Sequence, residues 1–334
     1  GEIPVAFSDG QRLWVTICIY LTVVGWSYSV VTLIALLQDK GFQNTLTTNR
    51  FARRVRQTRQ DFYLICGCGE TGGLIARSFD HIGQAFVVLE KDELRVEELD
   101  LLDFKTDTPA LAADARLPDN LRLAGLCHAK CRGVLAVTND DEANLAIAIA
   151  VRLLNPDIPV IARAEQKSVA ANMASFGTRH IINPFEKFAE YMALALHSPA
   201  AYNLLLWLTG LPGTTVARHR EPPKGKWVLC GYGAFGKVMT RALENAGLPV
   251  TIIDRAAPLA PDHTWYKGDG TGADALAAAG ISDAVGIVAA TASDVNNLST
   301  VVTAKQLNPA LFTVLRQNQV ANRTLFEAFE SDFT

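Results

Sequence analysis

Residues 66–72 read Cys-Gly-Cys-Gly-Glu-Thr-Gly, which has the glycine spacing G-x-G-x-x-G. An apolar run at 61–65 predicts a buried strand before this stretch, and a helical pattern follows it to about His81. A second apolar run at 85–89 predicts another strand, which ends at Glu90. A strand, a glycine turn, a helix, a strand and an acid in this order are typical of a dinucleotide-binding unit.

Each residue type at the turn has a physical role in holding a nucleotide. Gly67 and Gly69 let the backbone turn tightly and approach a pyrophosphate, and Gly72 lets the helix pack closely on the sheet. The N-terminus of that helix attracts the anion. Glu90 can accept hydrogen bonds from both ribose hydroxyls and would repel a 2′-phosphate. The sequence therefore favours NAD(H) or an adenine nucleotide, ATP or ADP, over NADP.

Strands and helices continue to alternate up to about residue 200, which predicts a parallel sheet with right-handed crossovers. Ligands of such sheets bind at the carboxyl ends of the strands. We place Asp114 and Ala115 beside the adenine, and Thr138 and Asn139 beside the nicotinamide or the terminal phosphate. Asp114 and Asp140 could instead only cap the helices that follow. The residues predicted to bind the cofactor here are Gly67, Gly69, Glu70, Thr71, Gly72, Glu90, Lys91, Asp114, Ala115, Thr138, Asn139, Asp140 and Arg163.

The segment before this domain has the length and composition of a membrane span. Residues 13–37 contain no charged side chain, which is enough to cross a hydrocarbon core as a helix. Five arginines follow between residues 50 and 59, so the positive-inside rule places everything after about residue 38 in the cytoplasm. We expect an inner-membrane protein, with residues 51–59 as a helix against anionic lipid. A simple membrane anchor is the alternative.

Composition argues against several other classes of protein. The net charge of -3 gives no basic field, so we predict no nucleic-acid partner. Six cysteines in 334 residues do not indicate a disulfide framework, which favours a reducing compartment. Cys127, His128 and Cys131 lack the spacing of a zinc site, and no histidine follows a strand end as a proton relay would. We therefore predict no metal, no catalytic residue and no enzymatic activity.

The opening motif occurs a second time. Residues 227–236 repeat the strand and the glycine turn, and the acid returns as Asp254. The first glycines (67 and 231) and the acids (90 and 254) are both 164 residues apart. Such an internal repeat indicates that both halves share one fold. The residues predicted to bind a cofactor in this half are Gly231, Gly233, Phe235, Gly236, Asp254, Arg255, Asp269, Gly270, Thr291 and Ser293.

The predicted fold class is therefore α/β, with two tandem Rossmann-like, doubly wound parallel-sheet domains preceded by one transmembrane helix. We assign residues 1–38 to a loop and the transmembrane helix, and residues 39–60 to a basic linker. Residues 61–200 form the first domain, 201–225 a crossover and linker, and 226–334 a second domain that is incomplete at its C-terminus.

This arrangement resembles the regulator-of-potassium-conductance domains of prokaryotic potassium channels, and is also similar to the NAD-binding peripheral subunit of potassium-uptake systems. The resemblance rests on both glycine turns with their acids, on Gly-Asp-Gly-Thr at 268–271, and on the Thr-x-x-Asp-x-x-Asn segments at 138–144 and 291–297. In that family a ring of such domains opens or closes the pore when ligand binds. The resemblance implies a homotetramer with a ring of eight regulatory domains, conducting potassium ions and surrounded by membrane lipid.

By that resemblance residues 13–37 form the inner pore helix and Gly25 is a gating hinge. Residues 1–4 resemble the loop at the exit of a selectivity filter, and the filter itself lies upstream. The leading prediction is thus a nucleotide-sensing gating module and pore helix of a potassium channel. The alternatives are a regulatory subunit of a potassium uptake or efflux transporter and, third, a membrane-tethered NAD-dependent oxidoreductase. The chain has Ala113 where the family usually has glycine, so either repeat could keep the fold without the ligand.

Overall fold

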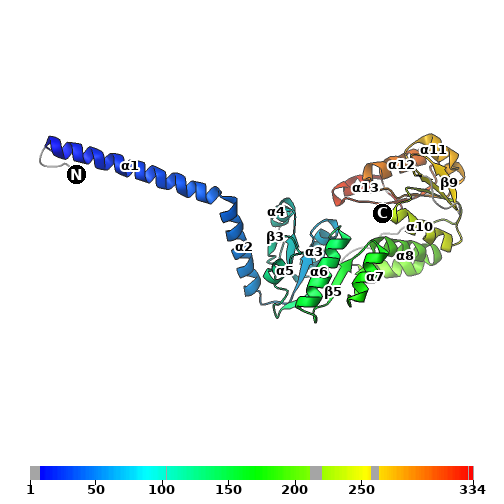
Figure 1. Ribbon diagram of the computed structural model, residues 1–334. Helices are drawn as coiled ribbons and strands as arrows, with labels where there is room; N and C mark the ends of the chain where they lie inside the picture. The colour runs from blue at the N-terminus through cyan, green and yellow to red at the C-terminus, as the bar shows by residue number, and fades with distance from the viewer. Residues whose placement is uncertain (1–7, 103, 211–219, 257–262, 330, 334) are drawn as a thin grey trace.

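The computed structural model describes residues 8–102, 104–210, 220–256, 263–329 and 331–333. A single long helix projects from two α/β lobes that follow one another along the chain (Figure 1). The predicted fold class, two tandem parallel-sheet domains behind one apolar helix, is confirmed. The expected filter exit at residues 1–4 lies outside the described residues.

Helix α1 (Asp9–Gln38) buries none of its side chains against the rest of the chain. Among the described helices it is the one that is long and apolar enough to cross a membrane. The hydroxyls of Thr16, Thr22, Ser29 and Thr32 each donate to the carbonyl four residues earlier, so their polarity is satisfied within the helix. A Cβ added to Gly25 would meet nothing within 4 Å in this chain.

Helix α2 (Lys40–Gln57) joins the apolar helix to the first lobe. The Asp39 carboxylate caps α2 by accepting from the Phe42 N–H at 2.8 Å, and the Gln43 amide donates to the Leu37 carbonyl at 2.7 Å. Phe51 and Val55, in the last turns of α2, are buried in the core of the first lobe. The helix we expected there is present, but its apolar face packs in protein instead of against lipid.

The first lobe is a six-stranded parallel sheet with the order β3-β2-β1-β4-β5-β6. The order reverses between β1 and β4, which is where doubly wound sheets open a ligand crevice. The strands are β1 (Phe62–Cys66), β2 (Ala85–Glu90), β3 (Ala110–Ala112), β4 (Cys131–Ala136), β5 (Val160–Arg163) and β6 (His180–Ile182). The helices are α3 (Glu70–His81), α4 (Glu93–Leu101), α5 (Pro118–Leu123), α6 (Asp141–Leu154) and α7 (Lys167–Ser175).

The second lobe repeats this topology with five parallel strands in the order β11-β10-β7-β8-β9. The predicted internal repeat is therefore a repeat of structure. The strands are β7 (Trp227–Cys230), β8 (Val250–Asp254), β9 (Thr264–Lys267), β10 (Gly286–Ala289) and β11 (Phe312–Leu315). The helices are α10 (Ala234–Asn245), α11 (Ala273–Ala278), η1 (Ile281–Asp283), α12 (Asp294–Leu307), η2 (Val320–Asn322) and α13 (Arg323–Phe329).

Two helices, α8 (Pro184–His197) and α9 (Pro199–Thr209), connect the lobes. Phe185 and Met192 of α8 are buried in one hydrophobic cluster with Trp227 and Phe235 of the second lobe. The crossover helix thus belongs by its core to the second lobe, although it directly follows the first sheet in the chain. The boundary that we drew at residue 200 does not coincide with the boundary between the two cores.

Candidate functional site

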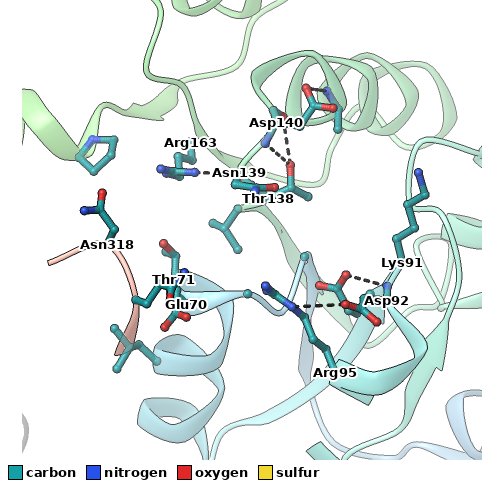
Figure 2. A pocket seen from close by; sticks show the side chains of 18 of the residues that line it. Glu70, Thr71, Lys91, Asp92, Arg95, Thr138, Asn139, Asp140, Arg163 and Asn318 are labelled. Carbon is teal, nitrogen blue, oxygen red and sulfur yellow. Dashed lines mark hydrogen bonds and ion pairs between the residues drawn. The ribbon is translucent and has the colours of Figure 1, made fainter. Parts of the chain in front are cut away.

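A cavity of about 1290 Å³ opens over the carboxyl ends of the first sheet. Its floor comes from the ends of β1 to β5, and its opposite wall comes from α8 and the second lobe. The residues from that wall are Pro184, Phe185, Phe188, Phe235, Leu315, Arg316, Gln317, Asn318 and Gln319. The cavity therefore lies between the two lobes (Figure 2).

The glycine turn at its centre requires glycine at two positions. Gly67 has a φ of +92°, and a Cβ on it would lie 2.7 Å from the Thr138 side chain. A Cβ on Gly72 would lie 2.0 Å from the Gly67 carbonyl oxygen, so α3 could not approach the strand so closely. Because Gly67 and Gly72 have no side chains, α3 can begin close to the end of β1, and its N-terminus lies at the cavity. A helix N-terminus stabilises an anion.

Glu90, at the end of β2, fixes the turn and faces the cavity. Its carboxylate accepts from the Cys68 N–H at 2.5 Å and from the Asp92 N–H at 3.0 Å. Each carboxylate oxygen has a second acceptor position. Glu90 can therefore hold the backbone in place and still receive ribose hydroxyls, as its position in the sequence predicts.

Arg95, on α4, lies across the turn. A Cβ on Gly69 would come within 2.5 Å of an Arg95 guanidinium nitrogen. The Arg95 Nε lies 3.8 Å from the Asp92 carboxylate. Figure 2 shows this arginine beside the turn that carries Glu70 and Thr71. A guanidinium in this place can pair with a phosphate held over the turn.

The two aspartates with alternative roles differ from each other. Asp140 accepts from the N–H groups of Glu142 and Ala143 and thus caps α6, as the alternative proposed. Asp114 caps no helix, since the N-cap of α5 is Leu117. Its carboxylate instead accepts from the Arg116 guanidinium at 2.6 Å, which lowers the pKa of Asp114. Both aspartates line the cavity.

The far end of the cavity is organised by Asn144 of α6. Its side chain accepts from the Thr138 N–H and donates to the carbonyl oxygens of Thr138 and Arg163, all at 3.0 Å. The Arg163 guanidinium donates to the Thr138 carbonyl and pairs with Glu165. Its Nε is buried and finds no hydrogen-bond partner among the described residues.

The second glycine turn has the same hydrogen-bonded frame. Gly231 has a φ of +99°, and a Cβ on Gly236 would lie 2.0 Å from the Gly231 carbonyl oxygen. Asp254 accepts from the Tyr232 N–H at 2.6 Å and from the Ala256 N–H at 2.8 Å. The backbone of the second turn therefore matches the first in detail.

The side chains around the second turn are different. The Tyr232 ring packs edge-on against Trp265 at 5.2 Å, and the Lys237 ammonium lies 5.8 Å from the Tyr232 ring centre. Arg255 forms an ion pair with Asp269. Tyr232 and Trp265 pack against the hydrophobic cluster that the second sheet shares with α8. A Cβ added to Gly233 would meet nothing within 4 Å.

The predicted cofactor residues therefore divide into two groups. Those of the first domain all line the cavity, apart from Gly72, which lies beneath the turn. Of the second-domain group Phe235 alone lines it, and it does so from the opposite wall, packed against Phe185 and Phe188. The remaining residues stay at the matching edge of their own sheet: Gly231, Gly233, Gly236, Asp254, Arg255, Asp269, Gly270, Thr291 and Ser293.

Sequence reasoning missed three arginines of this site. Arg95 lies on α4, a helix that the apolar pattern did not indicate. Arg116 lies two residues after Asp114 and pairs with it, which the strand and helix pattern does not indicate. Arg316 belongs to the second repeat, and the match of Arg316 to Arg163 in the repeat was the one available signal.

Comparison with known proteins agrees with this fold. Over 174 residues the chain is 26% identical to "Potassium channel protein 1" of Methanocaldococcus jannaschii, covering 52% of this chain and 51% of that protein. Over 106 residues it is 32% identical to a "Trk system potassium uptake protein TrkA homolog" of Pyrococcus horikoshii, covering 30% of this chain and 46% of that protein. The chain spans about half the length of the curated relatives it matches.

Two solved structures share the fold over nearly the whole chain. The GsuK channel bound to NAD superposes with a TM-score of 0.63 at 19% identity, over 99% of this chain and 71% of that one. GsuK bound to ADP gives 0.61 at 20% identity, over 100% and 80%. The model of the TrkA-N domain family matches residues 63–184 and again residues 227–333, one match for each lobe. The chain belongs to the TrkA-N domain family, and carries its domain twice.

Proposed function

We propose that the chain is the nucleotide-sensing gating module and inner pore helix of a potassium channel. A nucleotide bound over the first glycine turn controls potassium conductance. The observation that carries this proposal is the direct packing of α2 into the lobe that holds the cavity, with α2 continuing into the apolar helix α1.

The path from cavity to apolar helix is short. Phe51 and Val55 of α2 share a hydrophobic core with Phe62 and Leu64 of β1, the strand that ends at the glycine turn. At the other end of α2, the Asp39 cap and the contact from Gln43 to Leu37 hold the corner with α1. A shift of the lobe can therefore move α1. Such gating requires different nucleotide affinities in the open and closed states.

An adenine nucleotide, NAD(H), ADP or ATP, fits the residues at the site. The glycine turn, the α3 N-terminus and Arg95 accept a pyrophosphate, and Glu90 offers acceptors for a ribose. The GsuK channel, which shares this fold, has been solved with NAD and with ADP bound, which supports this class of ligand. The ligand supplies binding energy and no chemistry, in line with a sensor that is not an enzyme.

The remaining features of the channel belong to the same proposal. α1 crosses the inner membrane, with the residues after about 38 in the cytoplasm, and four copies place eight lobes in a ring around a potassium pathway. The exposure of the whole of α1 supports a lipid or subunit environment for it. The open space around Gly25 supports its role as a hinge.

A regulatory part of a potassium transporter is the second candidate. It is favoured by the TrkA homologue and by a putative potassium efflux antiporter, KefB of Alkalimonas amylolytica, 30% identical over 124 residues. The two candidates share the nucleotide site and differ in what α1 belongs to.

Flux through the complete gene product, reconstituted in liposomes, tests the proposal. We expect rubidium uptake down its gradient, with a rate that changes when ADP, ATP or NAD⁺ is added on the side of the lobes. Uptake that requires a proton gradient would favour the transporter. Titration of the detergent-solubilised chain with the same nucleotides is the companion measurement, and no heat of binding with any of them contradicts the sensor.

A further inference from the structure

The cavity has a second cationic wall opposite the glycine turn, formed by Arg163 of the first lobe and Arg316 of the second. We propose that this arginine pair binds the distal phosphate of the nucleotide, so that a ligand with two or more phosphates links the two lobes. The inference rests on the proposed function and names both the ligand class and the contact that couples it to the lobes.

The strand order sets the direction in which a nucleotide lies. The acid for the ribose is at the end of β2 and Asp114 is beyond β3, so the adenosine occupies that side of the sheet. The glycine turn follows β1, and Arg163 ends β5, two strands further on in the opposite direction. Neighbouring strands lie about 4.8 Å apart, which places the end of β5 roughly 10 Å from the turn. Figure 2 shows Arg163 and Asn318 at one side of the cavity and Lys91 and Asp92 at the other.

A single phosphate over the turn therefore lies short of the arginine pair. A second or third phosphate, or the second nucleotide of NAD, extends toward the ends of β4 and β5. AMP therefore lacks the contact with the arginine pair that ADP, ATP and NAD can make.

Arg316 lacks polar partners in the part of the chain that the structure describes. Its guanidinium lies 4.8 Å from the ring centre of Phe185 and 5.8 Å from that of Phe235, and it donates no hydrogen bond to a described residue. Burial is the largest influence and lowers the pKa of Arg316. Glu165 and Asp294 act to raise that pKa, and the nearby Arg163 acts in the same direction as burial. A half-buried cation without hydrogen-bond acceptors is unfavourable, so an anion in the cavity would be strongly stabilised there.

The backbone holds both arginines in place. Asn144 donates to the Arg163 carbonyl at 3.0 Å, and its counterpart Asn297 donates to the Arg316 carbonyl at 2.7 Å. Glu165 pairs with Arg163 and offsets one positive charge of the two. The Arg163 Nε is also without a hydrogen-bond partner among the described residues, so both arginines keep donors for an anion.

Because the turn belongs to one lobe and Arg316 to the other, a bridging phosphate stabilises only those conformations in which the lobes keep this spacing. AMP would fill the adenosine end without this effect. The number of phosphates, rather than the base alone, is thus what the cavity reports to the rest of the chain.

The test is the affinity of the detergent-solubilised chain for ADP and for AMP, measured by calorimetry. We expect the Arg316→Gln variant to bind ADP at least about tenfold more weakly, since a hydrogen bond to a charged group is lost, with AMP affinity unchanged. Arg220→Gln is the matched control. Arg220 also lies over a phenylalanine of the second lobe, 5.9 Å from Phe312, but does not line the cavity, and we expect it to alter neither affinity.

Equal affinities of Arg316→Gln and wild type for ADP, or equal losses for ADP and AMP, overturn the inference while leaving the nucleotide sensor intact. A wild-type chain that binds no nucleotide overturns the proposed function, and the inference with it. The wild type provides a check that needs no variant: it must bind ADP at least about tenfold more tightly than AMP.

Discussion

The two glycine turns of this chain share a frame and differ in what lies above it. Gly67 and Gly231 both have positive φ, and Glu90 and Asp254 each accept two backbone N–H groups around the turn. Gly67 and Gly69 line the large cavity, whereas Gly231 and Gly233 do not, and the Tyr232 ring beside the second turn packs against Trp265. The glycines and the acid therefore specify the fold of the unit, and the elements packed around the unit determine whether its turn lies in this cavity.

The largest expected effect tests the shared frame. Gly72→Ala and Gly236→Ala each place a Cβ 2.0 Å from a carbonyl oxygen, so each should destabilise its lobe by about 3 kcal/mol. Thermal unfolding measures this loss. Gly73→Ala is the control, because a Cβ there meets nothing within 4 Å and replacing a helical glycine is neutral or stabilising. A loss of stability in only one of the two variants would show that the two glycine turns are not structurally equivalent.

The next effect concerns a buried acid of the second lobe. Asp294 is 6% exposed and accepts from the Asn318 and Gln319 N–H groups and from the Asn322 amide. Burial acts to raise the pKa of Asp294, but these hydrogen bonds outweigh burial and lower it. We expect Asp294→Asn to cost about 2 kcal/mol at neutral pH.

The pH dependence of that cost follows from the sign of the shift. A carboxyl whose pKa is lowered in the folded state stabilises the protein above its unfolded pKa of about 3.9, and this contribution is lost as pH falls through the lower folded value. The difference in unfolding free energy between wild type and Asp294→Asn should therefore shrink below about pH 4. A difference that grows on acidification contradicts the hydrogen-bond account.

A third, smaller effect separates the sites by ligand affinity. Arg95→Gln removes the guanidinium that lies across the first turn, so AMP and ADP should both bind about tenfold more weakly. Lys237→Gln, beside the second turn, should change neither affinity. Calorimetric titration distinguishes this pattern from that of Arg316→Gln, which affects ADP alone. An Arg95 variant that loses ADP but keeps AMP would place this arginine at the distal phosphate.

The smallest effect is expected at the ion pair between Arg255 and Asp269, in which both side chains are largely exposed. Exposed pairs contribute about 0 to 1 kcal/mol, so Arg255→Gln should change the unfolding free energy by less than that. It should leave nucleotide affinity unchanged, since the pair lies away from the cavity. A clear loss of ADP affinity would instead indicate a functional second site.

Much of the fold could be predicted from sequence because its signals are local. Apolar runs, glycine spacing and the acid at a fixed distance marked β1, α3 and β2, and their repetition marked the second lobe. The wall of the cavity could not be predicted in the same way. Phe235 and Arg316 lie far from Gly67 in sequence and reach the cavity through the packing of α8 against α10. No pattern within either repeat encodes that packing.

The same limit applies to the second turn. Its glycines and Asp254 follow the pattern as well as those of the first turn. It lies outside the large cavity, because that cavity is built from the first sheet, α8 and the end of β11 with the residues that follow it, which the motif does not include. A motif thus predicts the backbone of a binding site, and the neighbouring elements determine its accessibility.

The central claim is that the first turn, and not the second, senses the nucleotide. Titration of the detergent-solubilised chain with ADP, for Glu90→Ala and Asp254→Ala, tests it most directly, because each change removes the same kind of carboxylate from an equivalent frame. We predict about one ADP per chain, affinity lowered at least about tenfold by Glu90→Ala, and affinity unchanged by Asp254→Ala. Equal losses in both variants, or a loss in Asp254→Ala alone, would contradict the account.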